Sequence, residues 1–200
     1  MQNQKIKILS NTAAQPQQNK IKILPDIKVD QDRQPFFSSL LDETLMTILT
    51  NGNKYNLFAY MDKDVVIEQF WNFEFEGQNV FKGKKISGVL KFQPDHPARP
   101  PKFYFNPVQS NGQVDQVIQH ENIYGDHSLC IPMLNDQVWN QSNIPYDILQ
   151  AIEHIFANPN WVEGSDAPAN PIFSSKSEQE KKQIQLKQAK FLPDFKLNSE

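Results

Sequence analysis

The chain has 200 residues, of which 38% are hydrophobic and 14 are phenylalanine, so it is long enough to bury the core of one domain. Its net charge of -3 is made up of both signs, which argues against nucleic acid as the main partner. No apolar run approaches the length of a membrane span, and the N-terminus lacks the apolar core of a secretory signal, so we expect neither membrane insertion nor export.

Residues 1–33 are expected to form a basic tail ahead of the folded domain. The tail is rich in Gln and Asn and has six basic and three acidic side chains, so it carries a charge of +3 while the remainder carries −6. One five-residue sequence, Lys-Ile-Lys-Ile-Leu, occurs twice, at 5–9 and at 20–24. This alternation suits a strand that adds to the sheet edge of a partner or of this chain's own domain. A disordered tail with a chance repeat is the alternative.

A helix is predicted to follow the tail, opening at Pro35 and stopping at Gly52. Large apolar residues recur across it at helical spacing, namely Phe36, Phe37, Leu40, Leu41, Leu45, Ile48 and Leu49. The pattern predicts a helix with one face against the core.

Four strands are predicted next, at Tyr55–Met61, Val65–Glu76, Lys84–Phe92 and Lys102–Phe105. In the second strand Trp71, Phe73 and Phe75 alternate with polar residues, as one buried face requires. Prolines at 97, 100 and 101 separate the last two strands, because proline cannot donate to a ladder. The strands are expected to form an antiparallel meander.

The stretch from Asn106 to Leu129 has little periodicity, and we expect this loop to hold the functional site. A central helix is predicted to begin at Asn143 and Pro145. Its inward-facing residues are Ile148, Leu149, Ile152 and Phe156. A last, weakly amphipathic helix is predicted from about Ser177 to Phe191. The elements together indicate the α+β class.

Cys130 is the only cysteine in the chain, and Asn122 lies eight residues before it. A thiol can take an acyl group without a strong partner base, and the product is a thioester. An amide such as that of Asn122 can donate to the oxyanion that forms when an amine attacks the thioester. A buried core thiol beside a turn-closing asparagine is the alternative.

The single cysteine also excludes an internal disulfide, which fits a reducing compartment. We therefore expect a cytoplasmic protein, with the nucleus as a second possible location. A mitochondrial location is a weaker option, because the first 25 residues contain no acidic residue but also no arginine.

Five short sequence motifs occur in the order found in one known family. They are Phe81-Lys82-Gly83-Lys84, the segment from Asp95 to Lys102 with its three prolines, His120-Glu121-Asn122, Cys130 followed by Trp139, and Asn158-Pro159-Asn160 leading to Asp166-Ala167-Pro168-Ala169-Asn170. From Trp71 to Asn170 the chain resembles a ubiquitin-conjugating enzyme domain. The resemblance implies that fold over residues 34–192, with a short C-terminal tail at 193–200.

The resemblance also implies roles for individual residues. Cys130 would accept ubiquitin or a ubiquitin-like protein from an activating enzyme, and Asn122 would stabilise the oxyanion when a lysine attacks. His120 would hold the loop, and Trp139 would pack under the site. Family members often place an acidic or hydroxyl group just before the proline equivalent to Pro168, where this chain has Ala167, so the substitutes would be Asp166 or Ser165. The resemblance implies no cofactor and no metal.

Three departures from the family pattern bear on catalysis and on ligase binding. Glu121 replaces the proline of the His-Pro-Asn motif, which removes a rigid bend and puts a negative charge beside the thiol if its side chain faces Cys130. Ala98 stands where many family members present a large apolar residue to ligases. Gln141 and Ser142 stand where they have Pro-Ala.

Two functions are therefore expected side by side. The first is a conjugating enzyme that works with an activating enzyme and a ligase. The second is a non-catalytic subunit that uses the fold as a scaffold in a larger assembly, reached through the N-terminal tail. A cysteine protease using His127 is a poor third, because nothing else in the chain indicates a substrate cleft or a preorganised base.

Overall fold

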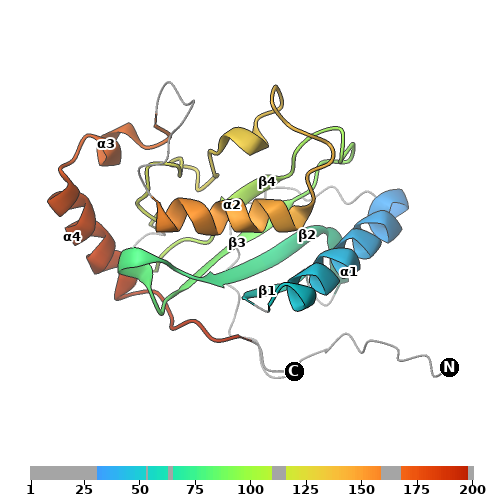
Figure 1. Cartoon of the computed structure of the whole chain (residues 1–200), viewed down its shortest axis with the longest axis horizontal. Helices are drawn as coiled ribbons and strands as arrows, with labels where there is room; N and C mark the ends of the chain where they lie inside the picture. The colour runs from blue at the N-terminus through green and yellow to red at the C-terminus, as the bar shows by residue number, and fades with distance from the viewer. Residues whose placement is uncertain (1–30, 53, 63–64, 110–115, 159–167, 198–200) are drawn as a thin grey trace.

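The computed structural model of the protein describes residues 31–52, 54–62, 65–109, 116–158 and 168–197. Both copies of the Lys-Ile-Lys-Ile-Leu sequence lie outside these ranges, as do Ser165 and Asp166. Figure 1 shows α2 lying across the sheet, with α1 at one end of the molecule and α3 and α4 at the other. The described elements are η1 (Gln31–Arg33), α1 (Gln34–Thr50), β1 (Tyr55–Asp62), β2 (Val65–Glu76), η2 (Asn79–Phe81), β3 (Lys85–Lys91), β4 (Lys102–Phe105), η3 (Pro132–Leu134), α2 (Pro145–Ala157), α3 (Pro171–Ser174) and α4 (Glu178–Ala189).

Helix α1 begins and ends where the sequence predicts. Pro35 lies in its first turn, where its missing N–H leaves no hydrogen bond unmade. Gly52, just after the end, has a φ of 94°, a left-handed conformation that glycine adopts without strain. Phe37 and Ile48 are buried against the core, whereas Leu49 is 50% exposed, so only part of the predicted apolar set faces inward.

The four strands form one antiparallel sheet in the order β1-β2-β3-β4, which confirms the predicted meander. The predicted third strand is one residue too long at each end, because Lys84 instead bridges Asp194 and the Phe92 N–H bonds to the Gln69 carbonyl. Gly88 pairs with Phe105 across β3 and β4, and a Cβ at Gly88 would collide with the neighbouring strand.

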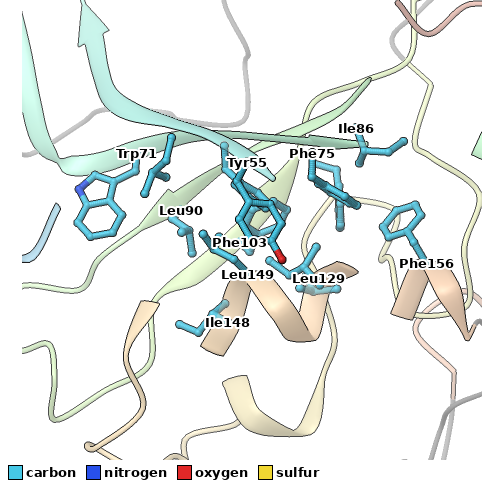
Figure 2. Close-up of a cluster of buried hydrophobic side chains, with 14 of the residues drawn as sticks. Tyr55, Trp71, Phe75, Ile86, Leu90, Phe103, Leu129, Ile148, Leu149 and Phe156 are labelled. Atoms are coloured by element: carbon cyan, nitrogen blue, oxygen red, sulfur yellow. The ribbon is translucent and has the colours of Figure 1, made fainter. Parts of the chain in front are cut away.

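Aromatic residues on the inner face of the sheet make up much of the core, and helix α2 covers them (Figure 2). Phe73 and Phe75 stack at 5.3 Å between ring centroids, and Phe103 meets Phe105 edge to face at 4.8 Å. Phe156 of α2 lies edge-on to Phe75 at 5.4 Å. Burying each such ring contributes roughly 1.5–3 kcal/mol of transfer free energy, so this layer is a large source of stability.

Helix α2 begins at Pro145, as predicted, and the Asp147 carboxylate accepts a hydrogen bond from the Ile144 N–H at 3.0 Å. The four residues predicted to face inward are all buried: Ile148, Leu149, Ile152 and Phe156. Their spacing places them on one side of the helix, against the sheet.

The last helix, α4, differs from α2 because a polar residue, Gln188, is among its buried positions. A capping box between Ser177 and Glu180 fixes its start. The short helix α3, which is capped by Asn170, was not predicted. Within the described part of the chain, no helix combines the length and apolar character that crossing a membrane requires.

Residues 193–197 pack against the sheet after α4. The Lys85 N–H donates to the Pro193 carbonyl at 2.7 Å, and the Asn56 side chain donates to the Lys196 carbonyl at 2.9 Å. The end of the described chain is thereby bound to both β1 and β3.

Candidate active site

Cys130 and Asn122 lie on two facing segments of one loop, joined by two hydrogen bonds. The Cys130 N–H donates to the Asn122 carbonyl at 2.8 Å, and the Asn122 Nδ2 donates to the Cys130 carbonyl at 3.0 Å. An isolated bridge between Ile123 and Leu129 continues the pairing. The asparagine side chain is therefore held on the backbone of the cysteine, although eight residues separate the two in sequence.

The thiol of Cys130 is half-buried, and Tyr124 contacts it. The Tyr124 hydroxyl donates to Sγ at 3.2 Å. This hydrogen bond, followed by burial and by the nearby Cys130 and Asp126, raises the pKa of Tyr124 above its usual value. The hydroxyl therefore stays protonated at neutral pH, where it acts as a donor and not as a base.

His120 is almost fully buried and bonds on both sides of its ring. Its Nδ1 accepts from the Asn122 N–H at 3.1 Å, so Nε2 carries the proton and donates to the Ile155 carbonyl at 3.1 Å. Burial lowers the pKa of His120 to about 4, and the hydrogen bond to Ile155 opposes that shift only in part. The ring is neutral at physiological pH and links the loop to α2.

The turn that precedes the cysteine has an unusual backbone. His127 has a φ of 70°, a left-handed conformation uncommon for a residue with a Cβ. The Asp126 carboxylate accepts from the Ser128 N–H at 3.0 Å and from its hydroxyl at 2.6 Å. Burial alone would raise the pKa of Asp126, but these hydrogen bonds outweigh it and hold the pKa below its usual value. The Phe105 N–H donates to the His127 carbonyl at 2.9 Å, which ties the turn to β4.

Glu121 forms an ion pair that the sequence did not reveal. Its Oε1 lies 2.6 Å from Nζ of Lys181 on α4, and both side chains are nearly buried. The negative charge of Glu121 is therefore paired with the positive charge of Lys181 and is not left uncompensated in the loop. The Glu121 carboxylate joins the loop to the last helix.

Trp139 lies beside the proline-rich segment that follows β3. Its indole N–H donates to the Pro97 carbonyl at 2.8 Å, and its ring centre is 6.0 Å from that of His96. The indole packs against the edge of the core, and so it braces the segment that carries Ala98.

The family model for ubiquitin-conjugating enzymes matches residues 44–188, more than half of the chain. The chain belongs to the ubiquitin-conjugating enzyme family. The matched region begins within α1 and ends within α4, so it contains the sheet, the loop with Cys130 and Asn122, and Trp139.

Within this ubiquitin-conjugating fold, the structure brings three of the predicted site residues together: Cys130, Asn122 and His120. The predicted substitutes Ser165 and Asp166 lie outside the described residues. A described residue a few positions later, Asn170, does contact the loop, because its N–H donates to the Glu121 carbonyl at 3.2 Å.

Sequence reasoning missed two residues of this ubiquitin-conjugating domain, Tyr124 and Lys181. A phenol six residues before the cysteine was a usable signal for the first, because both residues lie in the same loop. Lys181 is 51 residues beyond Cys130 and sits among other charged residues of α4, so no local pattern singles it out.

Proposed function

We propose that the protein carries ubiquitin or a ubiquitin-like protein as a thioester on Cys130 and transfers it to a lysine. The observation that carries the proposal is the hydrogen-bonded pair of Asn122 and Cys130, which sets an amide donor beside a partly exposed thiol in a member of the ubiquitin-conjugating family. The activating enzyme and a ligase are the partners that the family implies.

The first step is a thioester exchange. The Cys130 thiol gives up its proton to solvent and its sulfur attacks the thioester carbon held by the activating enzyme. The enzyme's own cysteine leaves as a thiolate and takes up a proton from solvent. The Tyr124 hydroxyl, which donates to Sγ, is placed to orient the sulfur. No external energy source is needed at this step, because one thioester replaces another.

The second step is aminolysis. A neutral lysine amine attacks the thioester carbon, the carbonyl oxygen becomes an oxyanion, and collapse expels the Cys130 thiolate while the new amide loses a proton to solvent. Asn122 Nδ2 has a second hydrogen beyond the one that it donates to the Cys130 carbonyl, and this second hydrogen is the proposed oxyanion donor. The bond to the carbonyl fixes the amide before the reaction begins.

The test is thioester loading. The full chain is incubated with ATP, an activating enzyme and each modifier of a broad panel, and products are compared with and without reductant. We expect a reductant-sensitive adduct for at least one modifier, and none with Cys130→Ala. Cys130→Ser keeps the side-chain size and should give an adduct that resists thiol reductants. If no modifier loads onto the wild-type chain, the enzyme proposal is wrong.

A non-catalytic scaffold is the second candidate, and one surface observation favours it. Ala98 is exposed, as are Gln141 and Ser142, so the place where family members hold ligases offers one methyl group and several polar groups. A scaffold would instead hold its partners through residues 1–30. Deleting these residues leaves every contact described for 31–197 in place, so the domain should stay folded while its co-purifying partners are lost. A truncated chain that keeps all its partners would contradict this second candidate.

A further inference from the structure

One face of α4 is hydrogen-bonded to the segment that leads into Asn122. Three side chains of the helix make four contacts with this segment: Gln188 Nε2 to the Val117 carbonyl at 2.8 Å, Gln119 N–H to Gln188 Oε1 at 2.9 Å, Gln185 Nε2 to the Gln119 carbonyl at 3.0 Å, and Lys181 Nζ to Glu121 Oε1 at 2.6 Å. We call these contacts the α4 ladder.

The spacing of these contacts follows from the residue periods of a helix and of an extended segment. Lys181, Gln185 and Gln188 are four and three residues apart, so they share one face of the helix. Their partners at 117, 119 and 121 recur every second residue, as along an extended chain. Polar side chains of the helix thereby bond to the segment, beside the apolar side chains of Val117 and Ile184 that line the same groove.

Burial makes these contacts specific. Gln188 is only 5% exposed, and a buried amide without hydrogen bonds would be costly, so its double contact with residues 117 and 119 defines a single arrangement. Lys181 is similarly enclosed and bonds to Glu178 as well as to Glu121. The hydrogen bond to Glu121 raises the pKa of Lys181, and the charged pair persists at physiological pH.

The ladder ends one residue before the proposed oxyanion donor. Glu121 is followed directly by Asn122, whose own N–H is bonded to His120. At the position of Glu121 the family motif has proline, whose ring fixes the backbone angle φ, and a glutamate leaves that angle free to rotate. The free rotation must be restrained by tertiary contacts, and the Glu121–Lys181 pair lies at that residue.

We propose that the α4 ladder positions the catalytic loop, with Lys181 acting through Glu121 to hold the Asn122 amide in register with Cys130. Lys181 is thus a positioning residue. Its contact from α4 restrains the backbone at residue 121, where the family motif has a proline. The inference rests on the proposed function, because it assigns the ladder to the aminolysis step.

The experiment separates loading from transfer. Wild type, Lys181→Met, Lys181→Arg, the double variant Glu121→Gln with Lys181→Met, and the control Lys182→Met are each charged with modifier and then mixed with free lysine in a single turnover. Lys182 is an exposed neighbour on the same helix. The double variant removes both charges, so it leaves no unpaired Glu121 that could cause misfolding. Thermal unfolding of every variant shows whether it is folded.

We expect Lys181→Met and the double variant to load at the wild-type rate and to discharge about tenfold more slowly, since a misplaced catalytic group costs rate without abolishing the reaction. Lys181→Arg keeps the charge and a donor, so it should restore discharge. Lys182→Met should match wild type in both steps. Equal discharge by the double variant and wild type, or loading and discharge that fall together with the unfolding temperature, would overturn the proposal.

A second readout does not depend on activity. In ¹⁵N-labelled protein the side-chain amide signals of Asn122, identified by their loss in Asn122→Ala, should shift in the double variant and stay unchanged in Lys182→Met. If wild type fails to load, the proposed function is wrong, and these signals still decide whether α4 positions Asn122. Unshifted Asn122 signals in the double variant would refute the ladder's role by themselves.

Discussion

The side-chain amide of Asn122 donates to the backbone carbonyl of Cys130 at 3.0 Å, while the Cys130 N–H donates back to the Asn122 carbonyl. The two residues therefore bond reciprocally across the loop, and neither can move far without breaking both bonds. The side-chain bond requires the Asn122 amide, whereas the backbone bond does not.

Replacing Asn122 should separate the two chemical steps. Asn122→Ala should still load at Cys130, since thioester exchange does not require the amide, but it should discharge to lysine roughly a hundredfold more slowly if the amide acts as an oxyanion donor. Single-turnover discharge with free lysine measures the difference. Asn140→Ala, at an exposed turn outside the loop, is the matched control. Equal discharge by Asn122→Ala and wild type would reduce Asn122 to a turn residue.

The buried ring of His120 predicts a pH dependence of stability. Its pKa is about 4 in the folded protein and 6.5 ordinarily, so the unfolded chain takes up the proton first as the pH falls. The stability that the neutral ring contributes is complete above about pH 6.5 and is lost as the pH falls toward 4, a change of about 3 kcal/mol. Urea unfolding of wild type and His120→Gln across this range should show a flatter pH dependence for the variant.

His96 is also buried with a lowered pKa, so some slope with the same sign should remain in His120→Gln. Parallel curves for wild type and His120→Gln would show that His120 does not titrate in this range.

Two glycines give a matched pair of stability predictions. A methyl group at Gly88 would collide with the Tyr104 carbonyl and the Phe103 ring, so Gly88→Ala should lower the free energy of unfolding by about 1–3 kcal/mol. Nothing lies within 4 Å of a Cβ at Gly125, so Gly125→Ala should be nearly neutral. Denaturant unfolding of both variants measures the contrast. Similar changes in the free energy of unfolding at the two positions would mean that β3 and β4 shift readily to make room for the methyl group.

The exposed Ala98 predicts weak binding to RING-type ligases. A large apolar contact in this place would contribute roughly 1.5–3 kcal/mol, so Ala98→Phe should tighten binding by about ten- to hundredfold. Calorimetric titration against several RING domains tests this, with the neighbouring Arg99→Ala as a control for nonspecific effects. Tight binding by wild type, or no gain from phenylalanine, would place the ligase surface elsewhere.

The sheet and α2 could be predicted because their buried positions follow a regular apolar pattern in the sequence. Phe73 and Phe75 alternate with polar residues and lie on the inner face, and Ile148 and Ile152 recur at helical spacing and face the sheet. Each signal is local, and the hydrophobic effect acts on every such residue in the same way. The proximity of Asn122 to Cys130 came from the family resemblance and not from periodicity.

The contacts of α4 could not be predicted in the same way. Gln185 and Gln188 look like surface residues in the sequence, but they bond to carbonyl groups that lie more than 60 residues earlier. The direction of the Glu121 side chain depends likewise on Lys181, 60 residues later. Polar contacts of this kind depend on which backbone groups the fold leaves unpaired, and only the folded chain defines those groups.

The sequence separation within the α4 ladder has a consequence for synthesis on the ribosome. The chain is made from its N-terminus, so Cys130 and Asn122 are translated before Lys181 and Gln188. A nascent chain that has not reached α4 carries both reactive residues but lacks the side chains that bond to residues 117–121. Ribosome stalling or a premature stop before residue 178 would therefore release a polypeptide with an intact cysteine in a loop that lacks its contacts with α4.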